Sequence, residues 1–451
     1  MERKVDSVEI ESQNHRTRPR RLTPGKIIGA VLVTLAAFRL LSGPAYECSH
    51  WRSQDPSSQA QSLEERAQKI LSTTPLIDGH IDFAEVLRGF YHNRIDQDKF
   101  HHEFENGKLP GHVDLARLRH GLSGGAFWSV FAPCPANGSD FSDENYYGSV
   151  QYTMQEIDVM NKLFAAYPND FAPKVNSAGA LDAFKSGKLI SPLGVEGLHQ
   201  IGNSAGTLRL FHDLGARYAT LTHNCHNIYA DAALLENPFR KSTPLWGGVS
   251  PLGRQMVHEM NRIGMIVDLA HVSEDTMVHV LGGRDDWSGS RAPVIFSHSS
   301  AYSLCPHPRN VKDHVLQLVK KHNSVVMANI ATSFIACADN GNANGVPDEV
   351  PGEATLGRFV EHIMHIGNLI GYDHVGVGTD FDGIPTTPLG MDDVSKYPDL
   401  VAELLRRGVS DEDAAKVVGG NVLRVWRDVD AVAVQMKAEG APILEDDLKN
   451  P

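Results

Sequence analysis

The stretch LIDGHIDF, residues 76–83, ends an apolar run with an imidazole and a carboxylate two positions apart. On an extended strand, side chains i and i+2 point the same way, so His80 and Asp82 can bind one ligand together. Burying these groups without a partner would cost free energy. Imidazole and carboxylate donors without a thiolate suit zinc, or alternatively manganese or cobalt. The pair therefore indicates half of a metal site.

Similar residues follow five further apolar runs: Glu196 in GVEG, His223 in LTHN, His271 in DLAHVS, His298 in FSHSS, and Asp380 with Asp382 in GVGTDFDG. A single histidine at such a position is usually a structural residue, but six such runs form a pattern. So many histidines and carboxylates exceed the ligands of one tetrahedral ion and fit two ions that share a bridging carboxylate. Two-metal hydrolases hold and activate a water in this way.

The elements that must position these residues are short apolar runs alternating with amphipathic, helix-like stretches, which predicts an α/β fold with a covered parallel sheet. We expect eight strands, over Leu76–Asp82, Gly124–Ala132, Leu189–Glu196, Ala216–His223, Gly264–Ala270, Ala292–Ser297, Ser324–Ile330 and His374–Thr379. We expect helices between them, for example over Pro251–Ile263, Glu274–Leu281, Asn310–His322 and Gly357–Ile370.

Eight such units over about 360 residues predict a (β/α)8 TIM barrel with insertions, whose active site lies at the carboxyl ends of the strands. The loops after the second, seventh and eighth strands would form the pocket walls. A doubly wound open sheet is the alternative, but no glycine-rich phosphate loop follows the first strand.

The composition of the 451-residue chain is that of a globular protein, with 41% apolar and 22% charged residues. The formal net charge of −13 argues against a nucleic-acid partner, because phosphate binding needs a basic face. No second linker follows residue 61, so we expect residues 62–451 to form one domain.

The N-terminus differs from the rest: residues 1–26 are basic, residues 27–41 (IIGAVLVTLAAFRLL) are apolar, and residues 42–61 read as a polar stem. As a helix the apolar run would span roughly 22 Å, short of the ~30 Å hydrocarbon core. We interpret it as a signal-anchor, since the basic segment before it is long, giving a single-pass membrane protein with the main domain outside the cytosol. A cleaved signal peptide and secretion are the alternative.

Export from the cytosol would allow disulfide bonds and N-glycosylation. Outside the cytosol the five cysteines can pair. The sequence Asn137-Gly138-Ser139 fits a glycosylated surface loop.

These motifs resemble those of the membrane dipeptidase (renal dipeptidase) family of the amidohydrolase superfamily. The similar segments occur in family order between roughly Pro75 and Val425: LIDGHID, GGAFWSVFAPC, GVEG, LTHNCHN, DLAHVS, IFSHSSAYSLC, RNV and GVGTDFDG. The resemblance implies a metallo-dipeptidase on the barrel fold, with two zinc ions per chain, dipeptide substrates and a homodimer.

Position by position, the resemblance implies a ligand set. His80 and Asp82 would bind the first zinc, and His271 and His298 the second. Glu196 would bridge both. A hydroxide held between the two ions would attack the scissile carbonyl.

The resemblance also implies residues for catalysis and substrate binding. Asp380 would lie at the first metal and move protons. His223 would contact the substrate and stabilise the oxyanion. Arg309 would pair with the C-terminal carboxylate, so a dipeptide would need that carboxylate free. Arg254 and Arg291 are the other arginines available for this role. We interpret Asp382 as a residue that supports the ligands from behind or belongs to the loop, and Asp78 as a group that orients His80 or the turn.

The resemblance pairs Cys134 with Cys225 and Cys305 with Cys337, which leaves Cys48 free to join two chains through the stem. The resemblance also admits dipeptides with a D-residue, cysteinyl-glycine dipeptides and β-lactams as substrates. The alternatives are another binuclear amidohydrolase, such as a lactonase, and a non-catalytic binding protein on this scaffold. Lactonase-like enzymes usually begin with HxH and bridge with a lysine, unlike the HxD and Glu196 here.

Overall fold

The computed structural model describes residues 61–446, all of which belong to one unit spanning Ala60–Pro451. The predicted basic segment, the apolar run at 27–41, Cys48 and nearly all of the stem lie outside the described residues. Their roles therefore stay predictions. None of the described helices is long and apolar enough to cross a membrane.

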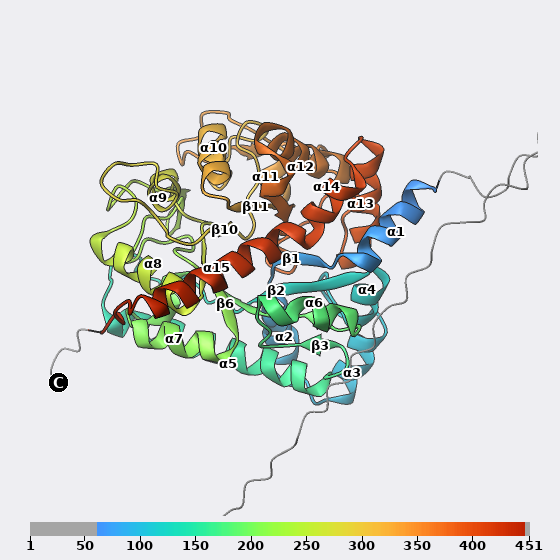
Figure 1. Ribbon diagram of the computed structural model, residues 1–451, viewed down its shortest axis with the longest axis horizontal. Helices are drawn as coiled ribbons and strands as arrows, with labels where there is room; N and C mark the ends of the chain where they lie inside the picture. The colour runs from blue at the N-terminus through green and yellow to red at the C-terminus, as the bar shows by residue number, and fades with distance from the viewer. Residues whose placement is uncertain (1–60, 447–451) are drawn as a thin grey trace, which may run out of the picture. The chain divides into compact units, whose positions relative to one another are not determined.

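Parallel strands form the centre of the described chain (Figure 1). All eight predicted strands are present, several of them shorter than expected, as β1 (Leu76–Ile81), β2 (Ser123–Ser129), β5 (Leu193–Val195), β6 (Ala216–Thr220), β9 (Ile266–Asp268), β10 (Ile295–Phe296), β11 (Val325–Ala328) and β14 (Val375–Val377). Their pairing order is β1, β2, β5, β6, β9, β10, β11, β14, and every pair is parallel. The carboxyl ends of all eight therefore meet at one edge.

The first strand also contacts the segment after the last one. Ile81 and Phe381 form a parallel bridge. The Asp82 N–H donates to the Phe381 carbonyl at 2.9 Å, and the Asp380 N–H donates to the His80 carbonyl at 3.0 Å. These bonds place Asp380 beside His80 and Asp82, although about 300 positions separate them in the sequence.

One of the predicted strands forms two separate strands in the structure. The expected strand Leu189–Glu196 is broken into β4 (Leu189–Ile190) and β5, because Pro192 has no N–H to donate to a neighbouring strand. β4 pairs with β2 and with β3 (Phe171–Ala172). Two hairpins were not predicted: β7 (Leu234–Glu236) with β8 (Phe239–Lys241), and β12 (Cys337–Ala338) with β13 (Asp348–Glu349).

The helices surround the sheet, and the four named from the sequence are present with shifts of up to three residues at their ends, as α8 (Pro251–Ile263), α9 (Glu274–Val280), α10 (Asp313–Lys321) and α12 (Leu356–Ile370). Ser250, Ser273 and Thr355 cap three of these helices by accepting a backbone N–H in the first turn. The other α-helices are α1 (Leu63–Thr73), α2 (Phe83–Tyr91), α3 (Asp98–Glu105), α4 (Leu115–His120), α5 (Asp143–Ala166), α6 (Ser177–Lys185), α7 (Ala205–Leu214), α11 (Thr332–Ile335), α13 (Tyr397–Arg406), α14 (Asp411–Ala415) and α15 (Asn421–Ala438).

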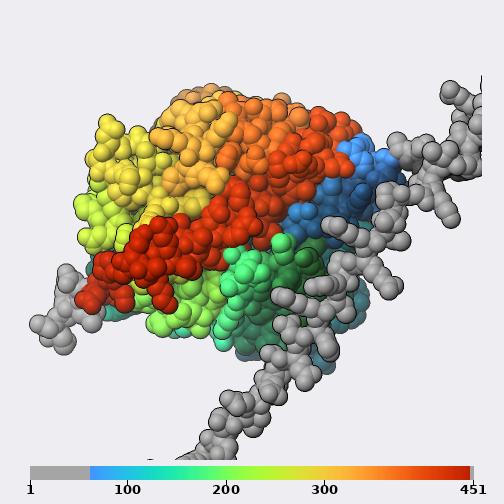
Figure 2. Space-filling view, viewed as in Figure 1, coloured from blue at the N-terminus to red at the C-terminus, as the bar shows by residue number. Residues whose placement is uncertain are grey.

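Helix α15 covers the amino ends of the strands. Its apolar side joins one buried cluster with side chains from the strands: Val422, Val425, Trp426 and Val429 with Ile77, Phe127, Tyr218, Ile266, Ile295 and Met327. Asn421 donates to the Val375 carbonyl at 2.8 Å, at the start of β14. In the space-filling view α15 forms a continuous diagonal band on the surface (Figure 2). The opposite, carboxyl ends are left for a site.

Candidate active site

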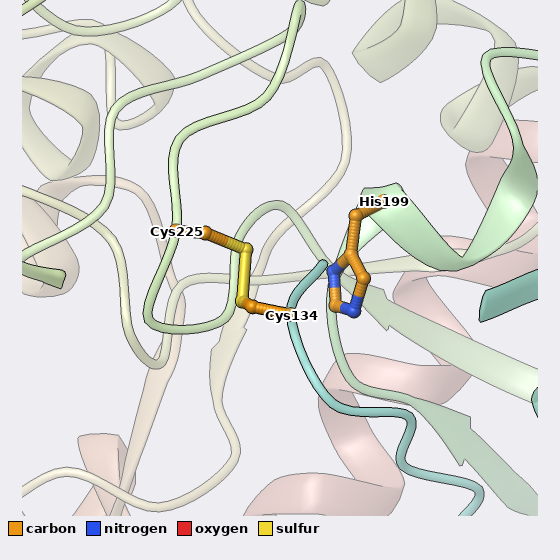
Figure 3. Close-up of side chains that lie close together, drawn as sticks. All are labelled: Cys134, His199 and Cys225. Atoms are coloured by element: carbon orange, nitrogen blue, oxygen red, sulfur yellow. A yellow bond between two sulfur atoms is a disulfide. The ribbon is translucent and has the colours of Figure 1, made fainter. Parts of the chain in front are cut away.

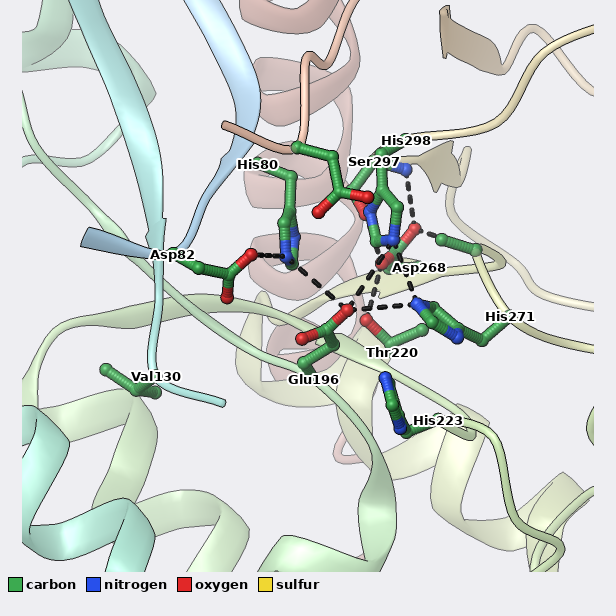
Figure 4. Close-up of polar contacts among 12 residues, drawn as sticks. His80, Asp82, Val130, Glu196, Thr220, His223, Asp268, His271, Ser297 and His298 are labelled. Atoms are coloured by element: carbon green, nitrogen blue, oxygen red, sulfur yellow. Dashed lines mark hydrogen bonds and ion pairs between the residues drawn. The ribbon is translucent and has the colours of Figure 1, made fainter. Parts of the chain in front are cut away.

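Five sequence-predicted ligands converge at the carboxyl ends of the strands (Figure 4), each at most 4% exposed: His80, Asp82, Glu196, His271 and His298. Glu196 lies at the centre. Its Oε1 is 3.4 Å from His80 Nε2, 3.0 Å from His271 Nε2 and 3.5 Å from His298 Nε2. Asp82 Oδ2 is 3.1 Å from His80 Nε2. One carboxylate thus faces three imidazoles from three strands.

The other ring nitrogen of each histidine is held by a polar side chain. His80 Nδ1 is 2.6 Å from the Tyr218 hydroxyl, His271 Nδ1 is 2.9 Å from Asn224 Oδ1, and His298 Nδ1 is 2.8 Å from Ser297 Oγ. Ser297 Oγ already donates to Asp268 Oδ2 at 2.7 Å, so it accepts the Nδ1 proton of His298. Asn224 Oδ1 likewise accepts the proton of His271. Such partners fix the tautomer of metal-binding histidines.

It follows that His271 and His298 turn unprotonated Nε2 atoms toward the centre. These two atoms are 2.9 Å apart, with no proton left for a hydrogen bond between them. Burial lowers the pKa of both imidazoles well below the ordinary value, which keeps them neutral. Facing lone pairs beside a carboxylate repel one another unless a cation lies among them. The donor set therefore fits a metal.

Two buried carboxylates brace the strand ends behind the cluster. Asp78 accepts from the His80 N–H, the Thr379 N–H and hydroxyl, and the Tyr397 hydroxyl, at 2.7 to 3.0 Å. Asp78 therefore orients His80, as the sequence predicted. Asp268 plays the same part for β6, β9 and β10, accepting from the Thr220 and Ser297 hydroxyls. Burial raises the pKa of both carboxyls, and these donors oppose the shift.

Asp380, His223 and Arg309 line a cavity of about 430 Å³ that also exposes Asp82, Glu196 and His271. Asp380 Oδ2 accepts from Asn329 Nδ2 at 3.1 Å, and the three carboxylate or imidazole groups of His80, Asp82 and Asp380 lie within 4.8 Å of one another. Burial and the charges of Asp82 and Glu196 raise the pKa of Asp380 well above its ordinary value, while His80 opposes this.

His223 lies beside His271. Its ring centre is 4.3 Å from that of His271, and its Nδ1 is 3.2 Å from Glu236 Oε1 on the β7–β8 hairpin. The hairpin thus fixes the ring that faces the cluster in Figure 4.

Arg309 is only 3% exposed, yet its guanidinium reaches the cavity. It lies over the Phe334 ring at 5.2 Å and donates to the His298 carbonyl at 3.4 Å. Burial lowers its pKa to about 10, so it remains charged at neutral pH. Arg254 and Arg291, the other arginines considered, instead pair with Asp286 and Glu439 outside the cavity.

Backbone strain accompanies two of these residues. His271 has φ of 64° and Asp380 has φ of 68°, in the left-handed region that side chains disfavour. Strained residues of this kind cluster at functional sites. Asp382 also has a positive φ, of 69°, but its Oδ1 accepts from the His112 N–H at 2.6 Å and stands apart from the ligand cluster, in agreement with its interpretation as a loop residue.

Both predicted disulfides are present, Cys134–Cys225 and Cys305–Cys337. Figure 3 shows the first beside His199. Because the two sulfurs are bonded to each other, this Cys–His–Cys group offers no thiolate ligands. The disulfide ties the loop after β2 to the segment that carries His223, and the Cys134 sulfur is 3.7 Å from His223 Nδ1.

Sequence reasoning missed several residues of this site. Tyr218 and Asn329 lie on predicted strands but resemble ordinary core positions. Asn224 and Ser297 adjoin predicted histidines in LTHN and FSHSS, which was a usable signal. The expected pocket walls are confirmed by Phe131 after β2, Phe334 after β11 and Ile384 after β14, and Glu85 adds an unpredicted wall after β1.

The comparison with known protein families decides the assignment. The family description "Membrane dipeptidase (Peptidase family M19)" matches residues 64–440. The chain belongs to the membrane dipeptidase family. It is therefore a hydrolase of the dipeptidase type, and its histidine and carboxylate groups agree with the metal dependence of a metallopeptidase.

Several known proteins are similar to this chain over most of its length. Dipeptidase tcpJ of Claviceps purpurea is 45% identical over 369 residues, 82% of this chain and 80% of that protein. Dipeptidase aclJ of Aspergillus oryzae is 44% identical and covers 85% of this chain and 84% of its own. The structure of the probable dipeptidase PvdM from Pseudomonas aeruginosa shares the fold, with a TM-score of 0.69 at 22% identity over 82% of this chain and 99% of that one.

Proposed function

We propose that this member of the membrane dipeptidase family is a zinc-dependent enzyme that hydrolyses dipeptides with a free C-terminal carboxylate. The observation that carries the proposal is the set of three imidazole Nε2 atoms within 3.5 Å of Glu196 Oε1, in one cavity with a buried arginine. The cluster supports metal binding, and the arginine supports recognition of an anionic substrate end.

The residues that would hold two zinc ions are His80 and Asp82 on one side, His271 and His298 on the other, and Glu196 between them. When bound there, the ions would lower the pKa of a water between them and polarise the scissile carbonyl. Asp78, Asp268, Tyr218 and Asn224 hold these ligands in place before any metal arrives.

The remaining residues handle protons and charge. Asp380, aimed by Asn329, would take the proton of the attacking water and give it to the leaving amine. His223, fixed by Glu236, would donate to the oxygen that becomes negative. Arg309 would hold the C-terminal carboxylate in a planar fork, at a fixed distance from the scissile bond.

The test is hydrolysis of Gly-Leu, Gly-D-Leu and C-amidated Gly-Leu by the zinc-loaded full chain. We expect cleavage of Gly-Leu and at least a hundredfold lower kcat/KM for the amide, because the amide leaves the Arg309 charge unpaired (roughly 3 kcal/mol). Equal cleavage of acid and amide would contradict the carboxylate requirement. Cleavage of Gly-D-Leu would extend the substrates to D-residues, which we include since a Rhodobacter sphaeroides structure of this fold holds a mimic of L-Ala-D-Ala.

We further propose that the eight strands close a (β/α)8 barrel, supported by the bridge between Ile81 and Phe381. Residues 27–41 would anchor the chain in a membrane with the enzyme outside, and the active form would be a homodimer. Asn137 would carry a glycan, since it is exposed in the loop between β2 and α5. A mobility shift on treatment with an N-glycosidase, lost in Asn137→Gln, tests the last point.

A further inference from the structure

One charged wall of the cavity has no part in the proposed mechanism. Glu85, in the first turn of α2, lines the cavity next to Asp82. Of the cavity's other carboxylates, Asp82, Glu196 and Asp380 belong to the ligand cluster, and Asp382 has a fully buried side chain that accepts from the His112 N–H. Glu85 is therefore the carboxylate of this cavity that is still available to a substrate.

Glu85 is held firmly although no cation pairs with it among residues 61–446. The Tyr152 hydroxyl of α5 donates to Glu85 Oε1 at 2.8 Å and lies 3.1 Å from Oε2. The Arg88 guanidinium lies 3.5 Å above the Tyr152 ring, and its Nη1 donates to Gln155 and Glu156 at 3.0 and 3.1 Å. The arginine thus fixes the tyrosine, and the tyrosine fixes the carboxylate without neutralising it.

The position of Glu85 relative to Arg309 gives the cavity a polarity. Glu85 follows β1, whereas Arg309 follows β10. In the pairing order β2, β5, β6 and β9 lie between these two strands, and across the bridge from Ile81 to Phe381 β14 and β11 do. The two opposite charges therefore enter the cavity from different sides, with the ligand cluster exposed between them. If Arg309 holds the carboxyl end of a dipeptide and the cluster holds its scissile carbonyl, the amino-side residue is the part left for Glu85.

We propose that Glu85 is a specificity residue that binds an ammonium group on the substrate residue at the amino side of the scissile bond. This rests on the proposed dipeptidase function. Two sources share this chemistry, the α-ammonium group present in every dipeptide and the side chain of an N-terminal lysine. A fixed, partly desolvated carboxylate attracts either one and repels an acidic side chain.

The experiment measures kcat/KM of the zinc-loaded full chain on Lys-Ala, Leu-Ala, Glu-Ala and propionyl-Ala, which lacks the α-ammonium group. The variants are Glu85→Gln and Tyr152→Phe. Glu103→Gln is the matched control, because Glu103 also accepts from a tyrosine hydroxyl (Tyr91, 2.5 Å) but does not line the cavity. Thermal melting of each variant separates a folding defect from a binding defect.

If Glu85→Gln lowers kcat/KM roughly tenfold on Lys-Ala alone and raises kcat/KM on Glu-Ala, the lysine side chain is assigned as the ligand. A similar loss on all three dipeptides through KM, with propionyl-Ala unaffected, assigns the α-ammonium group. Tyr152→Phe should give the same pattern more weakly, and Glu103→Gln should match the wild type. Glu85→Gln with wild-type kcat/KM on every substrate overturns the inference alone, whereas a wild type that cleaves no dipeptide overturns the proposed function and the inference with it.

Discussion

At the scale of single residues, His271 and His298 face each other through nitrogen atoms that have no proton to share. Their protons are committed to Asn224 and Ser297 on the other side of each ring. Asp380 belongs to the same centre, but its partner is the neutral Asn329 amide. This difference agrees with the proposal that the histidines hold metal and that Asp380 moves protons.

Asp380→Asn should therefore abolish most of the turnover while keeping the metal. The amide can still bond to Asn329 but cannot accept a proton, and removal of a general acid–base typically costs about 10² to 10⁴ in rate. Steady-state kcat on Gly-Leu, measured with zinc content on the same sample, checks this. Loss of zinc together with activity would instead make Asp380 a ligand.

A pH effect on stability is expected at Glu156, which is buried behind Glu85. Burial and the charge of Glu85 raise its pKa to about 8, against the pull of Arg88, from an ordinary value of 4.5. Between these two pH values the unfolded chain has released a proton that the folded chain still binds. Folding stability thus falls as pH rises through this window and stops falling above about 8.

Glu156→Gln has no proton to release, so the variant should gain stability relative to wild type as pH rises. The gain is at most about 1.4 kcal/mol per pH unit, and the ion pair with Arg88 reduces it. Melting temperatures of both proteins at pH 5 and pH 8.5 measure the effect. The same difference at both pH values would contradict the shifted pKa.

At the scale of elements, one glycine within β1 and one directly after β14 let the sheet fold tightly around its interior. A Cβ on Gly378 would lie 1.8 Å from the Ser297 carbonyl oxygen, and one on Gly79 would lie 2.3 Å from the same atom. Both contacts involve backbone, which cannot rotate away. The ligand-bearing ends of β1, β10 and β14 therefore depend on the absence of two side chains.

Gly378→Ala should lower the melting temperature strongly or prevent soluble expression, since overpacking of a rigid core costs about 1–3 kcal/mol or more. Gly148→Ala is the control, because an added Cβ there meets nothing within 4 Å and replaces glycine inside helix α5. The control should be neutral or stabilising by about 0.5–1 kcal/mol. Equal melting temperatures for the two variants would contradict the tight approach.

The Cys305–Cys337 disulfide fixes the loop that carries Arg309. It closes a separation of 32 residues, and its removal is expected to cost about 3–4 kcal/mol of stability. The double variant Cys305→Ser/Cys337→Ser should also raise KM for Gly-Leu more than it lowers kcat. The reason is that the disulfide positions the loop of Arg309, which would bind the substrate carboxylate, and does not hold the proposed metal ligands. Unchanged KM would show that the loop is positioned without the disulfide.

The apolar runs predicted the strands because buried parallel strands need continuous apolar sequence. The same rule failed at Pro192, where an apolar run is interrupted, and at the β7–β8 hairpin, whose Phe239 is exposed. Glu236 was missed with that hairpin. Tyr218 was missed because a tyrosine that supports a histidine reads like any core aromatic residue.

At the scale of the whole described chain, parallel pairing gathers residues from distant segments at one edge. The convergence of the proposed metal ligands could be predicted because each ends an apolar run, and strand ends share that edge. Glu85, Asn329 and Asp268 could not, since their roles depend on which side chains meet across strands. Helix α15 covers the amino ends of the strands, so chemistry is confined to the carboxyl ends.

The most direct measurement is the zinc content per chain, determined by inductively coupled plasma mass spectrometry on the full chain and on Glu196→Ala. A centre bridged by Glu196 predicts close to two zinc ions per wild-type chain and less than one in the variant, since the loss of the shared carboxylate weakens both sites together. A wild-type chain with one zinc ion or none, or a variant that keeps both, would contradict the bridged two-metal centre.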